Sequence, residues 1–141
     1  SELNAAYLWA QLEAAQKIYD DRMKSWNLYF ELLSDLEKQG KIELPCIPEG
    51  CTHNAHMFYI KTKNFDERTK MLSYLKDNGI NAVFHYIPLH SAPAGKKYGE
   101  FRGEDKYTTN ESERLVRLPM YYGLKESEIV YISEKVHEFW K

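Results

Sequence analysis

The chain has 141 residues, of which 43% are hydrophobic and 28% are charged, a balance typical of one folded domain. Its 19 basic and 21 acidic residues give a net charge of -2 without blocks of like charge, which argues against a nucleic-acid partner or a membrane-surface role. Cys46 and Cys51 are too few for a disulfide scaffold, so a reducing cytoplasm is the expected compartment, with a tight disulfide between them as the alternative.

Residues 1–40 are predicted to form one long linking helix. No glycine or proline interrupts it from Glu2 to about Gln39, Ser1 is a suitable N-cap, and Gly40 suits the position just after the helix. Apolar side chains recur at spacings of three and four, as on one helical face: Leu8, Leu12, Ala15, Tyr19, Met23, Trp26, Phe30 and Leu33. A straight helix of this length spans roughly 55 Å, more than the roughly 35–40 Å of a compact domain this size. We therefore expect it either to bend or to reach beyond its own domain.

Residues 41–141 are predicted to form a small α/β domain, so that the chain as a whole makes one unit. Strand patterns occupy residues 42–44, 56–62 and 80–84. Helical patterns run from Asn64 or Asp66 to about Asp77, from Thr108 or Thr109 to just before Pro119, and from about Glu126 to Trp140, with Gly79 closing the first of them. The expected fold class is therefore α/β, with a long N-terminal helix and a small mixed or antiparallel sheet packed with helices.

A long loop from His85 to Tyr107 follows the last predicted strand. Loops of this length in compact domains are usually functional or disordered, and its four tyrosine and phenylalanine side chains argue against disorder. His85 and His90 flank Pro88 within it, and histidines after a buried strand are well placed to contact a ligand. The alternative is that these imidazoles only pin the loop through hydrogen bonds.

Other signatures of chemistry are weak. His53 and His56 form an H-x-x-H pair, but at the start of a strand they would not converge, and no third ligand is suitably spaced, so no metal site is expected. The sequence has no G-x-S-x-G, phosphate-binding or dinucleotide-binding motif, and no lysine in a context that indicates a Schiff base. The residues alone thus predict a scaffold with one candidate binding loop.

Four stretches, in order along the chain, resemble the DegT/StrS family of sugar aminotransferases: SELNAAYLWAQLE (residues 1–13), HNAHMFYIK (53–61), GINAVFHYIPLHSAPAG (79–95) and ESERLVRLPMYYGLKESEI (111–129). The resemblance covers nearly the whole chain. It implies the C-terminal small domain of a fold-type I enzyme that uses pyridoxal 5'-phosphate (PLP) and works as a cytoplasmic homodimer. The implied substrates are glutamate and a dTDP-linked 4-keto-6-deoxyhexose, used in surface-polysaccharide synthesis.

The same resemblance implies which residues contact the substrate. His85 and Tyr86 match the family's H-Y pair and His90 matches the histidine that closes its P-L-H turn, so all three are expected near the sugar nucleotide. The lysine and other groups that hold PLP belong to a large domain expected upstream, so neither catalytic nor cofactor-binding residues are expected in this chain, which alone should be inactive and bind no cofactor. The competing hypothesis is a non-catalytic ligand-binding or dimerisation module.

Overall fold

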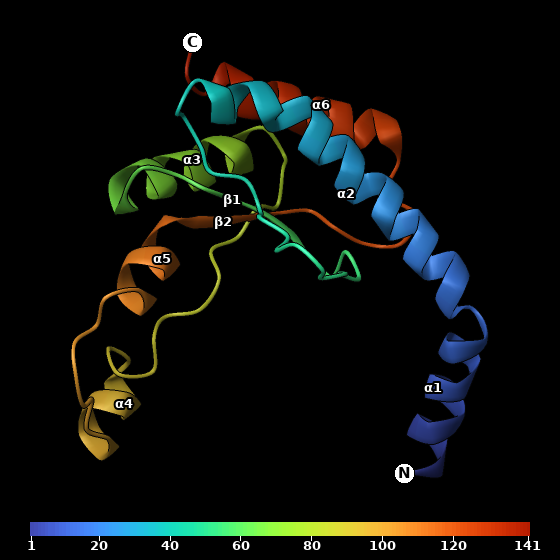
Figure 1. Cartoon of the computed structure of the whole chain (residues 1–141), viewed down its shortest axis with the longest axis horizontal. Coiled ribbons are helices and arrows are strands. Elements are labelled where there is room, and N and C mark those ends of the chain that lie inside the picture. Colours follow the sequence, from blue (N-terminus) through green and yellow to red (C-terminus); the bar gives the residue numbers. More distant parts are fainter.

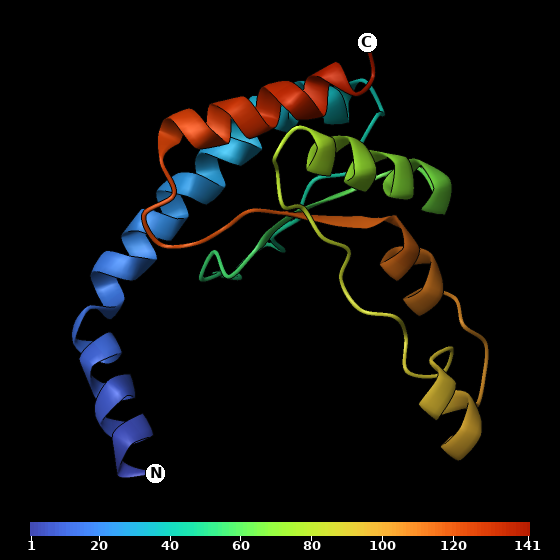
Figure 2. The ribbon, with the colours of Figure 1, turned by 180° about the vertical axis from the view of Figure 1, so that it is seen from behind.

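The computed structural model describes all residues, 1–141. The elements follow one another as α1 (Glu2–Glu13), α2 (Ala15–Lys38), β1 (Phe58–Lys61), α3 (Phe65–Asp77), α4 (Pro93–Tyr98), α5 (Thr108–Arg114), β2 (Leu115–Leu118) and α6 (Glu126–Glu138). They form an arch, in which α2, α3 and α6 lie on one side of the small sheet (Figure 1). Two arms extend on the other side, one made of α1 and the other of the segment that carries α4 and α5, as the opposite view also shows (Figure 2).

The long N-terminal helix predicted over residues 1–40 is helical from Glu2 to Lys38, but a bend at Ala14 divides it into α1 and α2. This residue leaves the helical region with φ -100° and ψ 6°, and its N–H bonds to the carbonyl of Gln11 three residues back. The next turn starts anew when the N–H of Ile18 bonds to the carbonyl of Ala14. The helix therefore bends, which is one of the two outcomes expected from its length, and α1 also reaches away from the core with none of its residues buried.

The apolar stripe predicted for the long helix is buried only along α2. Trp26 and Leu33 belong to the core, whereas Leu8 and Leu12 are each 58% exposed. Tyr29, outside the predicted stripe, is fully buried, stacks on the ring of Phe58 at 5.0 Å, and donates its hydroxyl to the carbonyl of Pro119 at 3.1 Å. Burial raises the pKa of Tyr29.

The sheet consists of β1 and β2, which pair antiparallel with Phe58 opposite Leu118 and Ile60 opposite Val116. Burial alternates along both strands, so the side chains of these four residues face the helices. Single bridges extend the pairing on each side, from Glu43 to Lys61 and from Val83 to Arg117.

Three strand and helix predictions are corrected by this sheet. The predicted strand at residues 42–44 is reduced to the bridge of Glu43. The predicted buried strand at residues 80–84 is wrong because only Val83 pairs with β2, through a single bridge to Arg117, and Val83 is 42% exposed. The helix predicted to run almost to Pro119 ends at Arg114, because Val116 and Leu118 are buried against the helices only if residues 115–118 are extended.

Two helices lie close to where they were predicted, at residues 65–77 and 126–138. The side chain of Asn64 caps α3 by accepting the N–H of Glu67 at 3.0 Å, and Gly79 closes it with φ 75°. At the start of α6 the carboxylate of Glu128 accepts the N–H of Lys125 at 3.0 Å. The α/β class and its antiparallel sheet are thus confirmed.

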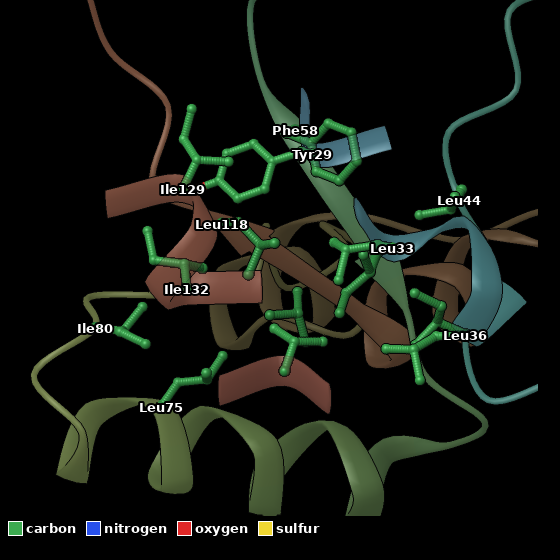
Figure 3. Packing of buried hydrophobic residues seen from close by; sticks show 14 of the residues in the cluster. Tyr29, Leu33, Leu36, Leu44, Phe58, Leu75, Ile80, Leu118, Ile129 and Ile132 are labelled. Atoms are coloured by element: carbon green, nitrogen blue, oxygen red, sulfur yellow. The ribbon is translucent and has the colours of Figure 1, made fainter. Parts of the chain in front are cut away.

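The hydrophobic core lies between the sheet, α2, α3 and α6, and its members come from all four (Figure 3). It contains 18 buried residues, among them Leu33 from α2, Leu75 from α3 and Ile129 from α6. None of the six helices combines the length and apolar character that crossing a lipid bilayer requires. The core therefore joins the sheet to α2, α3 and α6. Neither α1 nor α4 contributes a buried residue to it.

Candidate functional site

The candidate site is the second arm, where the chain leaves the sheet at Val83 and returns to it at Leu115. The loop predicted at residues 85–107 lies within this segment, and it contains the short helix α4, whose first turn begins at Pro93. Two close contacts shape it. A side chain at Gly95 would place its Cβ 1.6 Å from the carbonyl oxygen of Leu89, so only glycine fits there, and the hydroxyl of Ser91 donates to the carbonyl of Pro88 at 3.0 Å.

His90 closes this loop from within. Its Nε2 lies 2.8 Å from a carboxylate oxygen of Asp105 and 3.3 Å from the hydroxyl of Thr109, and its ring packs against Phe101 at 4.5 Å. The hydroxyl and N–H of Thr109 also donate to Asp105. These bonds, and then the neighbouring imidazole, hold the pKa of the Asp105 carboxyl below its usual value. His90 therefore makes the hydrogen bonds that the alternative hypothesis, a loop held by its histidines, predicted. Its imidazole connects the start of the loop to the residues at its end.

His85 and Tyr86 lie together at the base of the arm, with their rings 4.4 Å apart and inclined by 59°. The Tyr86 ring is 72% exposed, while His85 is half-buried and its Nδ1 is shielded from solvent without a hydrogen-bond partner. The structure thus brings two of the three predicted substrate-binding residues into contact, and places His90 in a separate cluster with Asp105 and Thr109.

Tyr86 borders a cavity of about 330 Å³ between α3, α5 and the loop. Arg68 of α3 lies in its wall, with the guanidinium carbon 4.6 Å from the ring centre of Phe65 and 5.3 Å from that of Phe84. Its Nε donates to the carbonyl of Glu113 at 3.0 Å, and burial lowers its pKa. The sequence offered no signal for Arg68, because its partners come from three different segments.

Two lysines of this chain, Lys61 and Lys135, have raised pKa values. An imine-forming lysine needs an amine that loses its proton readily, but the two lysines with shifted pKa values hold theirs more tightly. Burial alone would lower the pKa of Lys61, yet hydrogen bonds to the carboxylates of Glu111 and Glu43 raise it, and a bond to Glu138 raises that of Lys135. Lys61 and Lys135 therefore hold their protons more tightly than a free lysine, which makes these two side chains poor candidates for an imine. The structure also contains no cluster of three or more His, Cys, Asp or Glu side chains that could hold a metal ion.

Both arms carry large apolar side chains on their surface. On α1 these are Leu3, Tyr7, Leu8, Trp9 and Leu12, each between 58% and 83% exposed. On the second arm Leu89 is 85% exposed, and Tyr98 and Tyr107 are 79% and 74% exposed. Exposed apolar groups gathered in this way are typical of surfaces that bind another molecule or another part of the same one.

A sequence profile described as the DegT/DnrJ/EryC1/StrS aminotransferase family matches residues 1–137. The chain is 28% identical over 141 residues to a "Pleiotropic regulatory protein" of Geobacillus stearothermophilus. This alignment covers 99% of this chain and 37% of the relative. It is 24% identical over 137 residues to "dTDP-4-dehydro-2,3,6-trideoxy-D-glucose 4-aminotransferase" of Saccharopolyspora spinosa, covering 96% of this chain and 33% of that protein. The chain therefore spans about a third of the length of the curated relatives it matches.

Solved structures show the same fold. The aminotransferase TlmJ from Streptoalloteichus hindustanus superposes with a TM-score of 0.80 at 21% identity, covering 93% of this chain and 34% of that one. DesV of S. venezuelae, solved in complex with a ketimine intermediate, gives a TM-score of 0.77 at 25% identity, covering 96% of this chain and 35% of that one. The arch with its two arms is therefore an arrangement that occurs in known aminotransferases.

Proposed function

Because the chain belongs to the DegT/DnrJ/EryC1/StrS aminotransferase family, we propose that it is the small domain of a PLP-dependent nucleotide-sugar aminotransferase. The observation that carries this proposal is the family match over residues 1–137, which includes the core and both arms. The proposed protein also has a large domain, which supplies the lysine and the other groups that hold PLP. The cofactor supplies the amine-transfer chemistry, and this chain by itself is inactive.

The proposed reaction moves the amino group of glutamate to the 4-keto carbon of a dTDP-4-keto-6-deoxyhexose. Its product serves lipopolysaccharide or other surface-polysaccharide synthesis. The name of the Saccharopolyspora spinosa relative supports a dTDP-linked 4-keto sugar. The four stretches that resemble the family also resemble dTDP-4-amino-4,6-dideoxygalactose transaminase, which supports a 4-keto-6-deoxyhexose as the proposed substrate.

The part of this chain in the reaction is to shape one side of the substrate site. His85, Tyr86 and His90 are proposed to lie near the sugar nucleotide and to hydrogen-bond its hydroxyl or phosphate groups. The exposure of Tyr86 leaves its phenol free to do so. The bond from His90 to Asp105 orients the imidazole and keeps the loop closed around the substrate. Such positioning acts on binding rather than on the cofactor.

The proposed assembly is a cytoplasmic homodimer with its active sites at the subunit interface. The exposed apolar residues of α1 support a contact with further protein, because leaving five large side chains in water is unfavourable. A non-catalytic dimerisation module would also use this surface, so the enzyme assay below decides between the two.

The test is to incubate the full-length protein with PLP, glutamate and dTDP-4-keto-6-deoxyglucose and to follow the amino sugar by mass spectrometry. We expect the amino sugar and 2-oxoglutarate to form in equal amounts. Tyr86→Phe and His90→Ala should each raise the KM for the sugar nucleotide, and unchanged kinetics in both variants would remove the loop from the substrate site. A full-length protein that transfers no amino group to any nucleotide sugar would favour the binding-module hypothesis.

A further inference from the structure

Arg117 differs from the other four arginines of the chain. Arg22 donates to the carbonyls of Ala55 and His56, and Arg68 to that of Glu113. The two remaining ones, Arg102 and Arg114, form ion pairs with glutamates. Arg117 makes neither a side-chain hydrogen bond nor an ion pair, although its Nε is shielded from solvent.

The position of Arg117 in the sheet sets the direction of its side chain. Its neighbours Val116 and Leu118 are buried against the helices, so Arg117 projects from the opposite face of β2. Across the sheet it stands opposite Tyr59 on one side and Val83 on the other, with Val83 bound through both backbone bonds, at 2.7 and 3.1 Å. This face looks into the space between the two arms (Figure 1).

His85 follows Val83, the bridge partner of Arg117, by two residues. Phe84 between them contacts Arg68 of α3, on the helix side. Val83 pairs with Arg117 whereas Phe84 contacts Arg68, and this alternation, continued by one residue, directs His85 to the side of Arg117. Its Nδ1 is the second shielded nitrogen without a partner, whereas the imidazoles of His53, His90 and His137 each have one.

The charge around this pair favours an anion. Lys61, in the next row of the same face, is neutralised by Glu43 and Glu111 at 3.0 and 2.7 Å. No carboxylate lies within ion-pair distance of Arg117, so its guanidinium charge is uncompensated. Shielded donors without partners are rare in folded proteins because they cost free energy, and a guanidinium matches the two oxygens of a carboxylate or phosphate.

We propose that Arg117 and His85 form an oxyanion-binding site of the substrate pocket, which takes either a carboxylate of the amino donor or a phosphate of the nucleotide sugar. This inference rests on the proposed function for the identity of the substrates. The site proposed above contains only hydrogen-bonding loop residues, and Arg117 would add a positively charged group to it. In this site Arg117 and His85 both bind the anion, and neither takes part in the chemical step.

The test compares the full-length wild-type enzyme with Arg117→Gln, Arg117→Lys and His85→Gln. We expect Arg117→Gln to raise the KM for one of the two substrates about 10- to 100-fold, as for the loss of a hydrogen bond to a charged group. Arg117→Lys should recover part of the loss because it keeps the charge but not the two-point geometry. Lys38→Gln is the control, since it removes one exposed positive charge at the far end of α2.

Which KM rises tells the two anions apart. A rise confined to glutamate assigns the site to a carboxylate, and one confined to the sugar nucleotide assigns it to a phosphate. Calorimetric titration with glutamate and with dTDP measures the same binding without turnover. A wild-type protein that binds dTDP through Arg117 but transfers no amino group would refute the proposed function while supporting the oxyanion site. Unchanged affinity for both ligands in Arg117→Gln, or a lowered melting temperature with equal losses for both, would overturn the inference.

Discussion

Helices α1 and α2 are separated by one residue and both carry large apolar side chains, yet they have opposite surroundings. Five residues of α2 are buried, including Tyr29 and Leu33, and none of α1 is. The second arm behaves like α1, since α4 also buries none of its residues. The difference teaches that apolar content does not by itself locate the core: in this chain stability resides in α2, the sheet, α3 and α6, while the arms present apolar surface for contacts with other molecules.

The strongest test of this division is Leu33→Ala in α2. Leu33 is completely buried within the core, so the truncation leaves a cavity. We expect the free energy of unfolding to fall by about 2–5 kcal/mol. Urea denaturation followed by circular dichroism measures it, and a loss smaller than that of an exposed leucine would contradict the location of the core.

Gly95→Ala asks whether the second arm, despite its exposure, has a defined shape. The added Cβ would collide with the carbonyl of Leu89, so the turn must open, at a cost of about 1–3 kcal/mol. Hydrogen exchange measured by mass spectrometry should show faster exchange in residues 85–107 and unchanged exchange in α2 and α6. Ala94→Ser, at an exposed position next to it, is the matched control. Equal exchange in both variants would mean that the arm is not ordered by this contact.

The cluster of His90, Asp105 and Thr109 predicts a pH dependence confined to the second arm. Hydrogen bonds hold the folded-state pKa of Asp105 below its unfolded value, so its contribution to loop order is complete above the unfolded pKa and is lost as pH falls through the folded one. We expect the amide resonance of Thr109, which donates to this carboxylate, to shift below about pH 4 while core resonances stay constant. Asp105→Asn should abolish the shift, and a shift that persists would assign it to another group.

The smallest effect is expected for Leu8→Ala in α1. The side chain is 58% exposed and touches no core residue, so the free energy of unfolding of the chain should change by less than about 0.5 kcal/mol. In the full-length protein the same substitution should weaken self-association, measured by analytical ultracentrifugation. A loss of stability as large as that of Leu33→Ala would show that α1 packs on the core after all.

Local signals determined the elements whose ends are marked nearby. The Asn64 cap, the Gly79 turn and the alternating residues of β1 each act within about four residues, so the sequence predicted α3 and β1 well. The candidate loop was predictable for the same reason, because His85, Tyr86 and His90 follow one another in a short stretch with prolines. The role of His90 was not, since its partner Asp105 is brought to it only by the folded loop.

Tertiary structure alone decided the break at Ala14, the strand β2 and the pairing of Val83 with Arg117. No glycine or proline marks Ala14, and residues 115–118 follow a helical stretch without punctuation. They are extended because β1 offers them backbone partners and the helices cover Val116 and Leu118. Such pairing joins backbone groups about 60 residues apart. Their hydrogen bonds stabilise the strand only after the intervening chain has folded and brought them together. Propensity and periodicity report on neighbours in sequence, whereas Val83 and Arg117 are neighbours only in space.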